Sequence, residues 1–370
     1  MNRVRFIMVG GFLGAGKTTT IARLAQHYIN EGKKVGLVTN DQAYNLVDTQ
    51  LLRAKGFDVG EVPGACFCCK FDDLIKTTSS LSDQHSPDII ISEPVGSCTD
   101  LVATVLEPLR QLYKDQFELG PLAVLLKPEH GRKILRNEQS GFSPKAAYIF
   151  LKQIEEADVV VLNKTDKLSV DEREELVELV GERYPDKRIL ATSAKHGDEF
   201  EAVINAVSEM SHQHISFMDV DYKTYAEGEA ELGWLNCQAD FNSIKDGRFS
   251  LDDLVKSLVE TIRDGLAQSG DEAAHLKILG QSGVDAAVAN LVGAGVDVEM
   301  SLESEIKTTC ASVIVNARVA TDPETLEQLV RDSIESVANN NRLEFSVTGV
   351  QRFRPSPPVP THRVTSTESA

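Results

Sequence analysis

Residues 11–18 read Gly-Phe-Leu-Gly-Ala-Gly-Lys-Thr, which matches the phosphate-binding pattern G-x-x-x-x-G-K-[ST]. The pattern lies between an apolar run at 5–9 and an amphipathic stretch at 18–31, so we expect it to connect a strand to a helix. Its glycines let backbone N–H groups turn toward phosphate oxygens, and the helix N-terminus adds positive potential. The residues expected to bind a nucleotide here are Gly11, Gly14, Ala15, Gly16, Lys17, Thr18 and Thr19.

Two side chains of this loop have the chemistry for phosphoryl transfer. The Lys17 ammonium is expected to reach the β- and γ-phosphates, and the Thr18 hydroxyl to hold Mg²⁺. A second apolar run, at 88–92, ends at Glu93, and Gly96 follows three residues later. Glu93 is expected either to hold Mg²⁺ through water or to orient the attacking water, and the Gly96 N–H to bond the γ-phosphate until hydrolysis. The acid here is Glu, whereas Ras-like proteins have Asp.

A third motif predicts the base of the nucleotide. Asn163-Lys164-Thr165-Asp166 follows the apolar run 158–162 directly. A carboxylate in this position accepts from both guanine N1–H and the exocyclic amino group, and adenine offers no such pair of donors. Asn163 is expected to brace the loop, Lys164 to pack over the base, and the backbone of Ser193-Ala194-Lys195 to meet guanine O6. The order of the motifs, with Ser193-Ala194-Lys195 after the next predicted strand, favours GTP over ATP. The motif also lies at the carboxyl end of a predicted strand, where open α/β sheets bind ligands.

Three of the six cysteines, Cys66, Cys68 and Cys69, lie within four residues of one another. They stand between the phosphate loop and Glu93 in the sequence. They precede a predicted helix at whose N-terminus thiols ionise readily. Three thiolates can hold one ion such as Zn²⁺ and leave a position open; buried structural cysteines or a redox pair are the alternatives. A fourth ligand is left open among Cys98, His130, a water and a second subunit, although Cys98 taken alone is better explained by core packing.

The chain has 370 residues, with 38 Lys and Arg against 56 Asp and Glu, a net charge of −18. This acidity argues against a nucleic-acid partner, because phosphate backbones bind basic faces. Residues 218–370 hold 13 basic and 25 acidic residues, a net of −12, whereas residues 1–217 have a net of −6. Length and charge asymmetry predict two domains. No apolar stretch reaches the roughly 18 residues of a membrane span, and no signal peptide is recognised, so we expect a cytoplasmic protein without a membrane partner.

Continuous Val, Ile and Leu runs in the first part predict strands buried on both faces, and therefore an α/β fold with a parallel sheet between helices. Strands are expected at 5–9, 34–39, 88–92, 122–126, 158–162 and 188–192, and helices at 18–31, 70–81, 101–116, 143–156, 171–184 and 198–211.

The second part mixes strands and helices, which predicts a smaller α+β domain with one sheet face covered. Strands are expected at 234–241, 311–319 and 343–350, and helices at 251–267 and 323–338, while 280–305 fits no single element. The proline-rich end is expected to be extended and partly disordered. The predicted domains are therefore a P-loop GTPase domain at 1–217, an α+β domain at 218–350 and a tail at 351–370.

Other polar residues give weaker signals. His212-Gln213-His214 is interpreted as a solvated link between the domains rather than as a metal site. Cys237 and Cys310 lie in predicted strands and are expected in the core. A solvated acidic face is expected to contain Glu227, Glu229 and Glu231.

Together these motifs resemble the CobW branch of the CobW/HypB/UreG GTPases. The resemblance is carried, in this order, by the phosphate loop at 11–18, C-x-C-C at 66–69, E-x-x-G at 93–96 and N-K-x-D at 163–166. It is specific over about residues 5–210, and Gly233-Trp234-Leu235 also looks like part of the family's C-terminal domain. It implies a GTP-hydrolysing metallochaperone that binds zinc, cobalt or another divalent ion through the cysteines and delivers it to a client. Some members are tied to cobalamin pathways.

The resemblance also implies further site residues. Where the family usually has Asn-Glu after its second strand, this chain has Asn40-Asp41, so Asp41 becomes the candidate for the switch and for Mg²⁺. Asp48 matches a later acid of the family. Tyr44 replaces a family Glu and Ala65 replaces the usual Gly before the cysteines, which leaves the identity of the metal open.

We therefore expect a GTPase that loads Zn²⁺ or Co²⁺, or a metal-bearing cofactor, onto a client metalloprotein or cofactor-dependent enzyme, with a homodimer as an open alternative. A P-loop kinase for a small molecule is a second class, against which Asn163 and Asp166 argue. A regulatory or reactivation GTPase with a structural zinc is a third, and predicts a metal affinity independent of nucleotide. The expected metal ligands are Thr18, Asp41 and Glu93 for Mg²⁺, and Cys66, Cys68 and Cys69 for the delivered ion.

Overall fold

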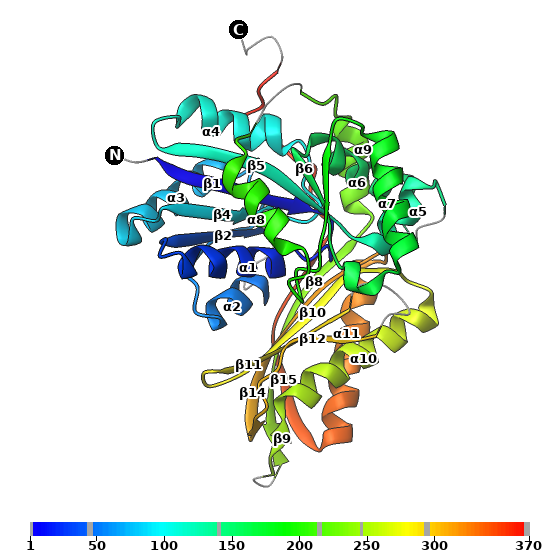
Figure 1. Ribbon diagram of the computed structural model, residues 1–370. Helices are drawn as coiled ribbons and strands as arrows, with labels where there is room; N and C mark the ends of the chain where they lie inside the picture. Colours follow the sequence, from blue (N-terminus) through cyan, green and yellow to red (C-terminus); the bar gives the residue numbers. More distant parts are fainter. Residues whose placement is uncertain are drawn as a thin grey trace. The chain divides into compact units, whose positions relative to one another are not determined.

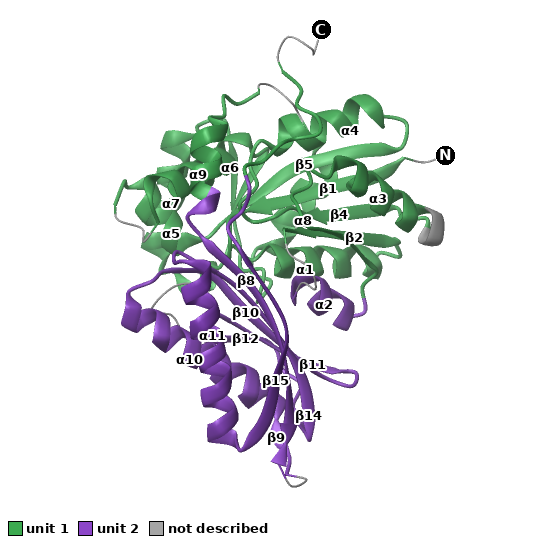
Figure 2. Ribbon diagram, turned by 180° about the vertical axis from the view of Figure 1, so that it is seen from behind, with its two compact units in different colours: residues 1–42, 57–228, 357–370 green, residues 43–56, 229–356 purple. Residues whose placement is uncertain are grey.

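The computed structural model of the chain describes residues 3–42, 47–138, 142–212, 217–244, 247–291 and 297–365. The chain divides into two compact units, drawn in green and purple in Figure 2. Unit 1 comprises residues 1–42, 57–228 and 357–370, and unit 2 comprises residues 43–56 and 229–356. The predicted boundaries at 217 and 350 differ from this division, because an early helix joins unit 2 and the last residues return to unit 1.

Unit 1 is built on seven parallel strands in the order β3-β2-β4-β1-β5-β6-β7. The strands are β1 Val4–Gly11, β2 Val35–Asp41, β3 Val59–Pro63, β4 Ile89–Glu93, β5 Phe117–Leu126, β6 Val159–Leu162 and β7 Arg188–Ala191. The helices are α1 Lys17–Asn30, α3 Phe71–His85, α4 Glu107–Leu112, α5 Pro128–Leu135, α6 Pro144–Glu156, α7 Val170–Arg183 and α8 Phe200–Glu209, followed by α9 Tyr222–Ala230 at the border of the units. Helices α1 and α8 cover one face of the sheet and α3 and α6 the other (Figure 1). The predicted α/β fold is confirmed.

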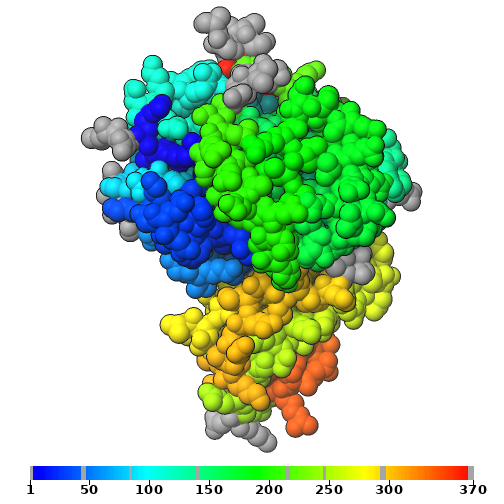
Figure 3. All heavy atoms as spheres, viewed as in Figure 1, coloured from blue at the N-terminus to red at the C-terminus, as the bar shows by residue number. Residues whose placement is uncertain are grey.

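Burial explains why these apolar runs form central strands. Residues 6–9 of β1 are completely buried, as are Ile90 and Ile91 of β4, so side chains on both faces of the sheet are covered. Helices α1 and α8 pack side by side on one face (Figure 3), with the Tyr28 hydroxyl 2.7 Å from that of Ser208. The strand order reverses on either side of β1. In open α/β sheets, ligands bind beyond the carboxyl ends of the strands at such a reversal.

Unit 2 contains an antiparallel sheet in the order β12-β11-β10-β14-β8-β15. Its strands are β8 Gly233–Ser243, β10 Ala273–Ser282, β11 Asp285–Leu291, β12 Glu299–Leu302, β14 Cys310–Val319 and β15 Leu343–Phe353, and the short β9 Phe249–Ser250 and β13 Lys307–Thr308 pair separately. Helices α10 Leu251–Ser269 and α11 Pro323–Asn341 enclose the main core with one sheet face. Helix α2 Val47–Ala54 packs on Leu279 and Val288, which belong to the opposite face because Leu279 follows the core residue Ile278 directly. The predicted α+β unit is confirmed.

Several segments differ from their sequence-based prediction. The stretch 280–305 supplies the end of β10 and the strands β11 and β12. The predicted helix 101–116 begins as a π-helical turn at Val102–Leu106 and ends with α4. Strand β15 extends to Phe353, and the described residues 354–365 form no helix or strand, although Val364 is buried. No helix in the described ranges is long and apolar enough to cross a membrane.

The core of unit 2 offers a matched test of burial. Phe241 and Phe345 lie opposite each other on β8 and β15, but Phe241 is fully buried and Phe345 is 38% exposed. Phe241→Ala is expected to lower the free energy of unfolding by about 3–5 kcal/mol, because it leaves a cavity in the core. Phe345→Ala is expected to lower it by about 1 kcal/mol or less. Urea denaturation followed by the fluorescence of Trp234, the single tryptophan, measures both; equal losses would contradict the assigned core.

Candidate nucleotide and metal site

The phosphate loop connects β1 to α1, as the sequence predicts. Gly16 has a φ of 94°, and a Cβ on it would lie 2.3 Å from Asn163 Nδ2, so only glycine fits there. Lys17 is buried, and its Nζ donates to the carbonyl oxygens of Gly11 at 3.0 Å and Phe12 at 3.4 Å. The ammonium is therefore held over the loop, where it can exchange these carbonyl oxygens for phosphate oxygens.

Glu93, at the end of β4, lies beside the phosphate loop. Its buried carboxylate accepts a hydrogen bond from the Thr18 hydroxyl at 3.1 Å. A Cβ built on Gly96 would lie 3.0 Å from Lys17 Nζ, so the backbone of Gly96 passes directly by the lysine. Asp41 ends β2, the neighbour of β4 in the sheet. The structure thus brings the predicted magnesium and γ-phosphate residues to adjacent strand ends.

A buried amide joins the phosphate loop to the predicted guanine loops. Asn163 Nδ2 donates to the carbonyl oxygen of Ala15 at 2.8 Å, and Asn163 Oδ1 accepts from the backbone N–H of Ala194 at 2.9 Å. The Ser193 hydroxyl donates to the Asp166 carboxylate at 2.6 Å. The side chain of Asp166 is therefore oriented by the loop that follows the next strand of the sheet.

The remaining predicted nucleotide residues lie around this framework. Lys164 adopts a left-handed conformation with φ of 63°, and Gly14 has φ of 73°. Thr19 is exposed on the first turn of α1, and Lys195 is exposed beyond β7. Arg23 of α1 carried no motif signal, yet it donates to the carbonyl oxygens of residues 194 and 195 at 2.7 and 2.8 Å. It ties the helix that starts at the phosphate loop to the guanine loop.

The amide of Asn40 holds the cysteine loop at the end of β2. Its Nδ2 donates to the carbonyl oxygens of Val62 and Ala65, both at 2.7 Å, and its Oδ1 accepts from the Phe67 N–H at 2.8 Å. Phe67 is fully buried, which anchors the loop between its cysteines. The backbone position next to Asp41 is therefore linked by direct hydrogen bonds to the loop that carries the thiols.

The thiols of Cys66, Cys68 and Cys69 face one another. The Cys66 sulfur lies 2.8 Å from that of Cys68 and 3.2 Å from that of Cys69, and the last two are 3.8 Å apart. All three sulfurs lie within 4.8 Å of one another. Sulfur ligands at about 2.3 Å from a tetrahedral Zn²⁺ are separated by about 3.8 Å. Small side-chain adjustments would therefore let the cluster hold the ion.

The thiols also differ in acidity. Hydrogen bonds from Cys68, Cys69 and Cys98 hold the pKa of Cys66 well below its usual range. The hydrogen bond with Cys66 raises the pKa of Cys68 well above its usual range, and that of Cys69 to about 11. A sulfur whose pKa is lowered by its neighbours suits the binding of a soft or borderline ion.

The last described residues lie over this cluster. The Val359 N–H donates to the Cys69 sulfur at 3.2 Å. Thr361 donates from its N–H to the Cys68 carbonyl oxygen at 2.7 Å and from its hydroxyl to the Cys69 carbonyl oxygen at 3.2 Å. Residues 357–365 therefore cover one side of the cysteine loop. The Pro-rich composition of this tail gave no signal of such docking.

The same tail also contacts the segment that follows β4. Arg363 Nε donates to the Asp100 carboxylate at 2.8 Å, and the Tyr222 hydroxyl donates to the same oxygen at 2.7 Å. The Val364 N–H bonds to the carbonyl oxygen of Ala103 at 2.9 Å. One short stretch of chain thus contacts both the cysteine loop and the segment beyond Glu93 and Gly96.

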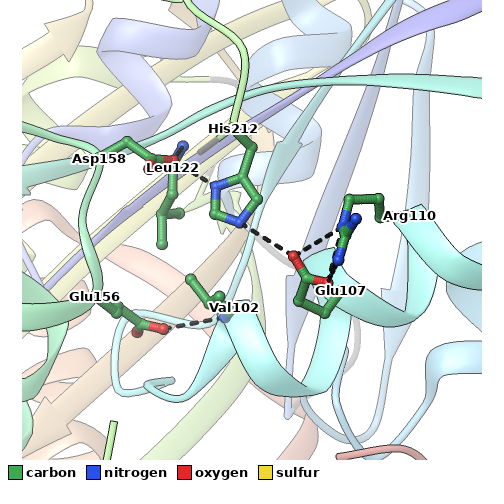
Figure 4. Close-up of polar contacts among 7 residues, drawn as sticks. All are labelled: Val102, Glu107, Arg110, Leu122, Glu156, Asp158 and His212. Carbon is green, nitrogen blue, oxygen red and sulfur yellow. Dashed lines mark hydrogen bonds and ion pairs between the residues drawn. The ribbon is translucent and has the colours of Figure 1, made fainter. Parts of the chain in front are cut away.

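Glu156, at the end of α6, supports that segment from inside. Its carboxyl oxygens accept from the Thr99 hydroxyl at 3.1 Å and from the Val102 N–H at 3.2 Å, the second of which is drawn in Figure 4. Burial, together with the nearby charge of Asp100, raises the pKa of Glu156 to about 8. The group is therefore protonated in the folded protein at neutral pH.

His212 corrects one prediction. Its side chain is 2% exposed, with Nδ1 2.6 Å from the Asp158 carboxylate and Nε2 3.8 Å from that of Glu107, which also pairs with Arg110 (Figure 4). The prediction that this segment is a solvated link was wrong for His212. Its ring is buried between the carboxylates of Asp158 and Glu107, which are distant from it in sequence. His214 lies outside the described residues.

Two other expectations are corrected. Cys310, expected in the core, is exposed at the start of β14, whereas Cys237 is buried as expected. Glu229, expected on a solvated face, is 2% exposed, while Glu227 pairs with Lys145 at the surface of unit 1.

Two further candidates are occupied elsewhere. His130, an alternative fourth metal ligand, lies 3.2 Å from Lys127 Nζ and has its ring against Phe142. Asp48, matched to a family acid, forms an ion pair with Lys277 inside unit 2.

The comparison with protein families agrees with this geometry. The sequence model described as "CobW/HypB/UreG, nucleotide-binding domain" matches residues 5–191, half of the chain. The chain belongs to the CobW/HypB/UreG family. The match runs from β1 to β7 and includes the phosphate loop, the cysteine loop, Glu93 and Asp166, so the resemblance stated from the motifs is confirmed.

Relatives within the CobW/HypB/UreG family span much of the chain. The "Zinc chaperone CobW" of Sinorhizobium sp is 28% identical over 258 residues, which cover 64% of this chain and 70% of that protein. The "Zinc chaperone YeiR" of Escherichia coli (strain K12) is 26% identical over 193 residues, 51% of this chain and 55% of its own. Among solved structures, HypB from Helicobacter pylori in complex with nickel is 20% identical with a TM-score of 0.42, and covers 58% of this chain and 92% of its own. Zn(II)-bound YjiA GTPase from E. coli is 15% identical with a TM-score of 0.35, covering 91% and 99%.

The buried Glu156 predicts a pH dependence of stability. Its pKa rises from an ordinary value of 4.5 to about 8 on folding. Between pH 4.5 and pH 8, the carboxyl group is therefore protonated in the folded state and ionised in the unfolded state. Stability should therefore fall as pH rises from about 4.5 to about 8, by up to about 1.4 kcal/mol per pH unit, and level off above. Glu156→Gln should remove this loss and gain stability relative to wild type across the window.

Urea denaturation of both proteins at several pH values measures this difference. Glu155→Gln is the matched control, because Glu155 is a half-exposed neighbour that pairs with Lys152. A constant difference between wild type and Glu156→Gln from pH 5 to 8 would show that the carboxyl group is already charged in the folded protein.

Proposed function

We propose that the protein is a GTP-hydrolysing metallochaperone that delivers a divalent metal to a client protein. Zinc is the preferred candidate for this metal, and cobalt is the second. The observation that carries the proposal is the hydrogen bonding of Asn40. This residue precedes Asp41 at the end of β2, and its side chain holds the loop of Cys66, Cys68 and Cys69. Thiols on a loop that is hydrogen-bonded to the strand end carrying Asp41 suit a protein in which nucleotide state governs metal binding. The names of the relatives as zinc chaperones support zinc as the ion.

Guanine recognition is supported by the two loops that meet at Asp166. A carboxylate held by the Ser193 hydroxyl keeps a second oxygen for the N1–H and amino group of guanine. Through its hydrogen bonds to Ala15 and Ala194, Asn163 fixes the distance between the phosphate loop and the predicted guanine-binding loop. We therefore assign Lys164 and the backbone of residues 193–195 to the base, and residues 11–19 to the phosphates.

The residues around Glu93 fit a magnesium ion. A buried hydroxyl and carboxylate 3.1 Å apart are oxygen ligands of the kind Mg²⁺ takes, and Asp41 is a third candidate. When bound, the ion would neutralise charge on the phosphates. With nucleotide and ion bound, Lys17 would hold the phosphate oxygens and the Gly96 N–H would contact the γ-phosphate. Glu93 would either help to hold the ion through water or orient the attacking water. The products are GDP and phosphate.

The client is proposed only by chemical class. It is a metalloprotein or a cofactor-dependent enzyme, and a link to cobalamin metabolism rests on the family resemblance alone. Residues 218–370, with a net charge of −12, are our candidate for a docking surface, and this acidity also leaves nucleic acid an unsuitable partner.

Replacing Asp166, the residue proposed to recognise guanine, tests the preference for GTP. Asp166→Asn is expected to weaken GTP binding at least about a hundredfold, because an amide cannot accept from both guanine donors. The same variant is expected to gain affinity for xanthosine triphosphate, whose 2-oxo group accepts from the new amide. Competition against a fluorescent guanine nucleotide measures GTP, ATP and xanthosine triphosphate, with the exposed Asp171→Asn as control. An unchanged GTP preference in Asp166→Asn would overturn the assignment.

Replacing the thiols tests the metal site. A Cys66→Ser/Cys68→Ser/Cys69→Ser variant is expected to lose Zn²⁺ and Co²⁺ binding, while Cys237→Ser, in the core of unit 2, keeps it. Titration against a chelating indicator should be run with GDP and with a non-hydrolysable GTP analogue. Wild-type affinity should differ between the two nucleotides. If the triple variant bound the metals with wild-type affinity, the three cysteines would not be the site of the delivered ion. If the metal affinity of wild type were independent of the nucleotide, a regulatory GTPase with structural zinc would be favoured.

A further inference from the structure

The tail of the chain is bound to the cysteine loop through its backbone. The three prolines of residues 357–361 have no N–H group, so Val359 and Thr361 supply the only backbone donors of this segment. Both donors are directed at the cysteine loop. Val359 bonds to the Cys69 sulfur at 3.2 Å, and Thr361 bonds to the Cys68 carbonyl oxygen at 2.7 Å. The segment therefore lies on the loop in the way that an extended peptide lies in a binding site.

A second set of contacts fixes the end of the same segment. Arg363 Nε donates to the Asp100 carboxylate at 2.8 Å, and the guanidinium lies 5.5 Å from the centroid of the Tyr222 ring. The Val364 N–H bonds to the Ala103 carbonyl oxygen at 2.9 Å, and the Val364 side chain is buried. The segment is therefore attached to unit 1 on both sides of the residues that cover the thiols.

Asp100 makes this site selective for a cation. Its side chain is 2% exposed, and its carboxylate accepts hydrogen bonds from the Tyr222 hydroxyl and from Arg363. A carboxylate that is buried in this way is strongly destabilised when its cationic partner leaves, because water cannot replace the lost interaction. Any segment that takes the place of the tail must therefore bring a positive charge to Asp100.

We propose that residues 359–364, which we call the strap, occupy a binding site for an extended basic segment, and that the client displaces the strap with such a segment of its own when it takes the ion. The proposal rests on the proposed function, since it concerns delivery from the same cysteine cluster. The client segment bonds to the cysteine loop through its backbone and places an Arg against Asp100. The metal ligands of the client are thereby brought beside the thiols.

The strap also explains how delivery can be restricted to one client. Because the strap belongs to the same chain, it competes with any other segment at a high effective concentration. A chelator without a basic segment meets a cluster that is covered on one side. A client with the matching segment gains the contacts that the strap gives up, so the site discriminates between acceptors of the ion.

Two substitutions loosen the strap without changing a metal ligand. Val359→Pro removes the N–H that bonds to Cys69. Since the Val359 side chain is 75% exposed, Val359→Ala is the matched control that keeps this N–H. Arg363→Ala removes the cation at Asp100. Its control is Arg354→Ala, which changes an arginine of the same tail that bonds to carbonyl oxygens of unit 2.

The rate of zinc transfer to a fluorescent chelating indicator measures the effect in the full chain. Val359→Pro and Arg363→Ala are expected to transfer zinc about tenfold faster than wild type, the change that follows from removing one hydrogen bond of the closed strap. Both controls should match wild type, and guanine-nucleotide affinity should be unchanged in all four variants, which shows that they are folded. Wild-type rates in both loosened variants would overturn the proposal.

A synthetic peptide with the sequence of residues 355–365 tests the kind of segment that the site accepts. Added in excess to the Arg363→Ala chain, it is expected to replace the weakened strap and to slow zinc transfer toward the wild-type rate. The same peptide carrying Arg363→Ala should have no effect. Equal effects of the two peptides, or no effect of the first, would overturn the assignment of a basic segment.

The two levels of the argument fail separately. Retained zinc binding in the Cys66→Ser/Cys68→Ser/Cys69→Ser variant would refute the cargo site, and with it the proposed function. Loss of zinc binding in that variant, together with wild-type transfer rates in Val359→Pro and Arg363→Ala, would refute only the strap.

Discussion

The short loop that follows β4 is the constraint on which both candidate sites depend. At its start Glu93 accepts a hydrogen bond from Thr18 of the phosphate loop. Beyond its end Asp100 accepts one from Arg363 of the tail, whose Val359 N–H donates to the Cys69 sulfur. The Gln153 side chain fixes the backbone between these ends. Because so few residues separate Glu93 from Asp100, we expect a shift at the phosphate end to reach the tail that covers the cysteine loop. Close packing transmits such shifts rather than absorbing them.

The rest of unit 1 holds the partners of this loop in place. Two buried asparagine side chains link neighbouring segments by hydrogen bonds to backbone groups. Asn163 links the phosphate loop to the predicted guanine-binding loop, and Asn40 links β2 to the cysteine loop. The tail adds a third connection, since Val359 contacts the cysteine loop and Arg363 contacts Asp100 beyond β4. The chemistry of phosphate, base and thiol groups is thus supported by hydrogen bonds to backbone atoms rather than by the motifs alone.

Much of this arrangement follows from the sequence, and the missing parts have physical causes. The motifs predicted the phosphate loop, the positions of Glu93 and Asp166 at strand ends, and the parallel sheet, because each depends on local spacing and on continuous apolar runs. Cys98 is buried, as its interpretation as a core residue expected, whereas His212 was interpreted as solvated because its partners Asp158 and Glu107 lie far away in sequence. The docking of the tail was also missed, since backbone N–H groups that bond to a sulfur or a carbonyl oxygen leave no trace in residue types.

The measurement that tests the central claim most directly is the release of zinc during a single turnover of GTP. Zinc-loaded protein is mixed with GTP and a fluorescent zinc indicator, and the phosphate released is followed in parallel. Our account predicts that zinc reaches the indicator at the rate of phosphate release, and that a non-hydrolysable GTP analogue holds it back. Zinc release at the same rate with GTP, with the analogue and without nucleotide would contradict the account.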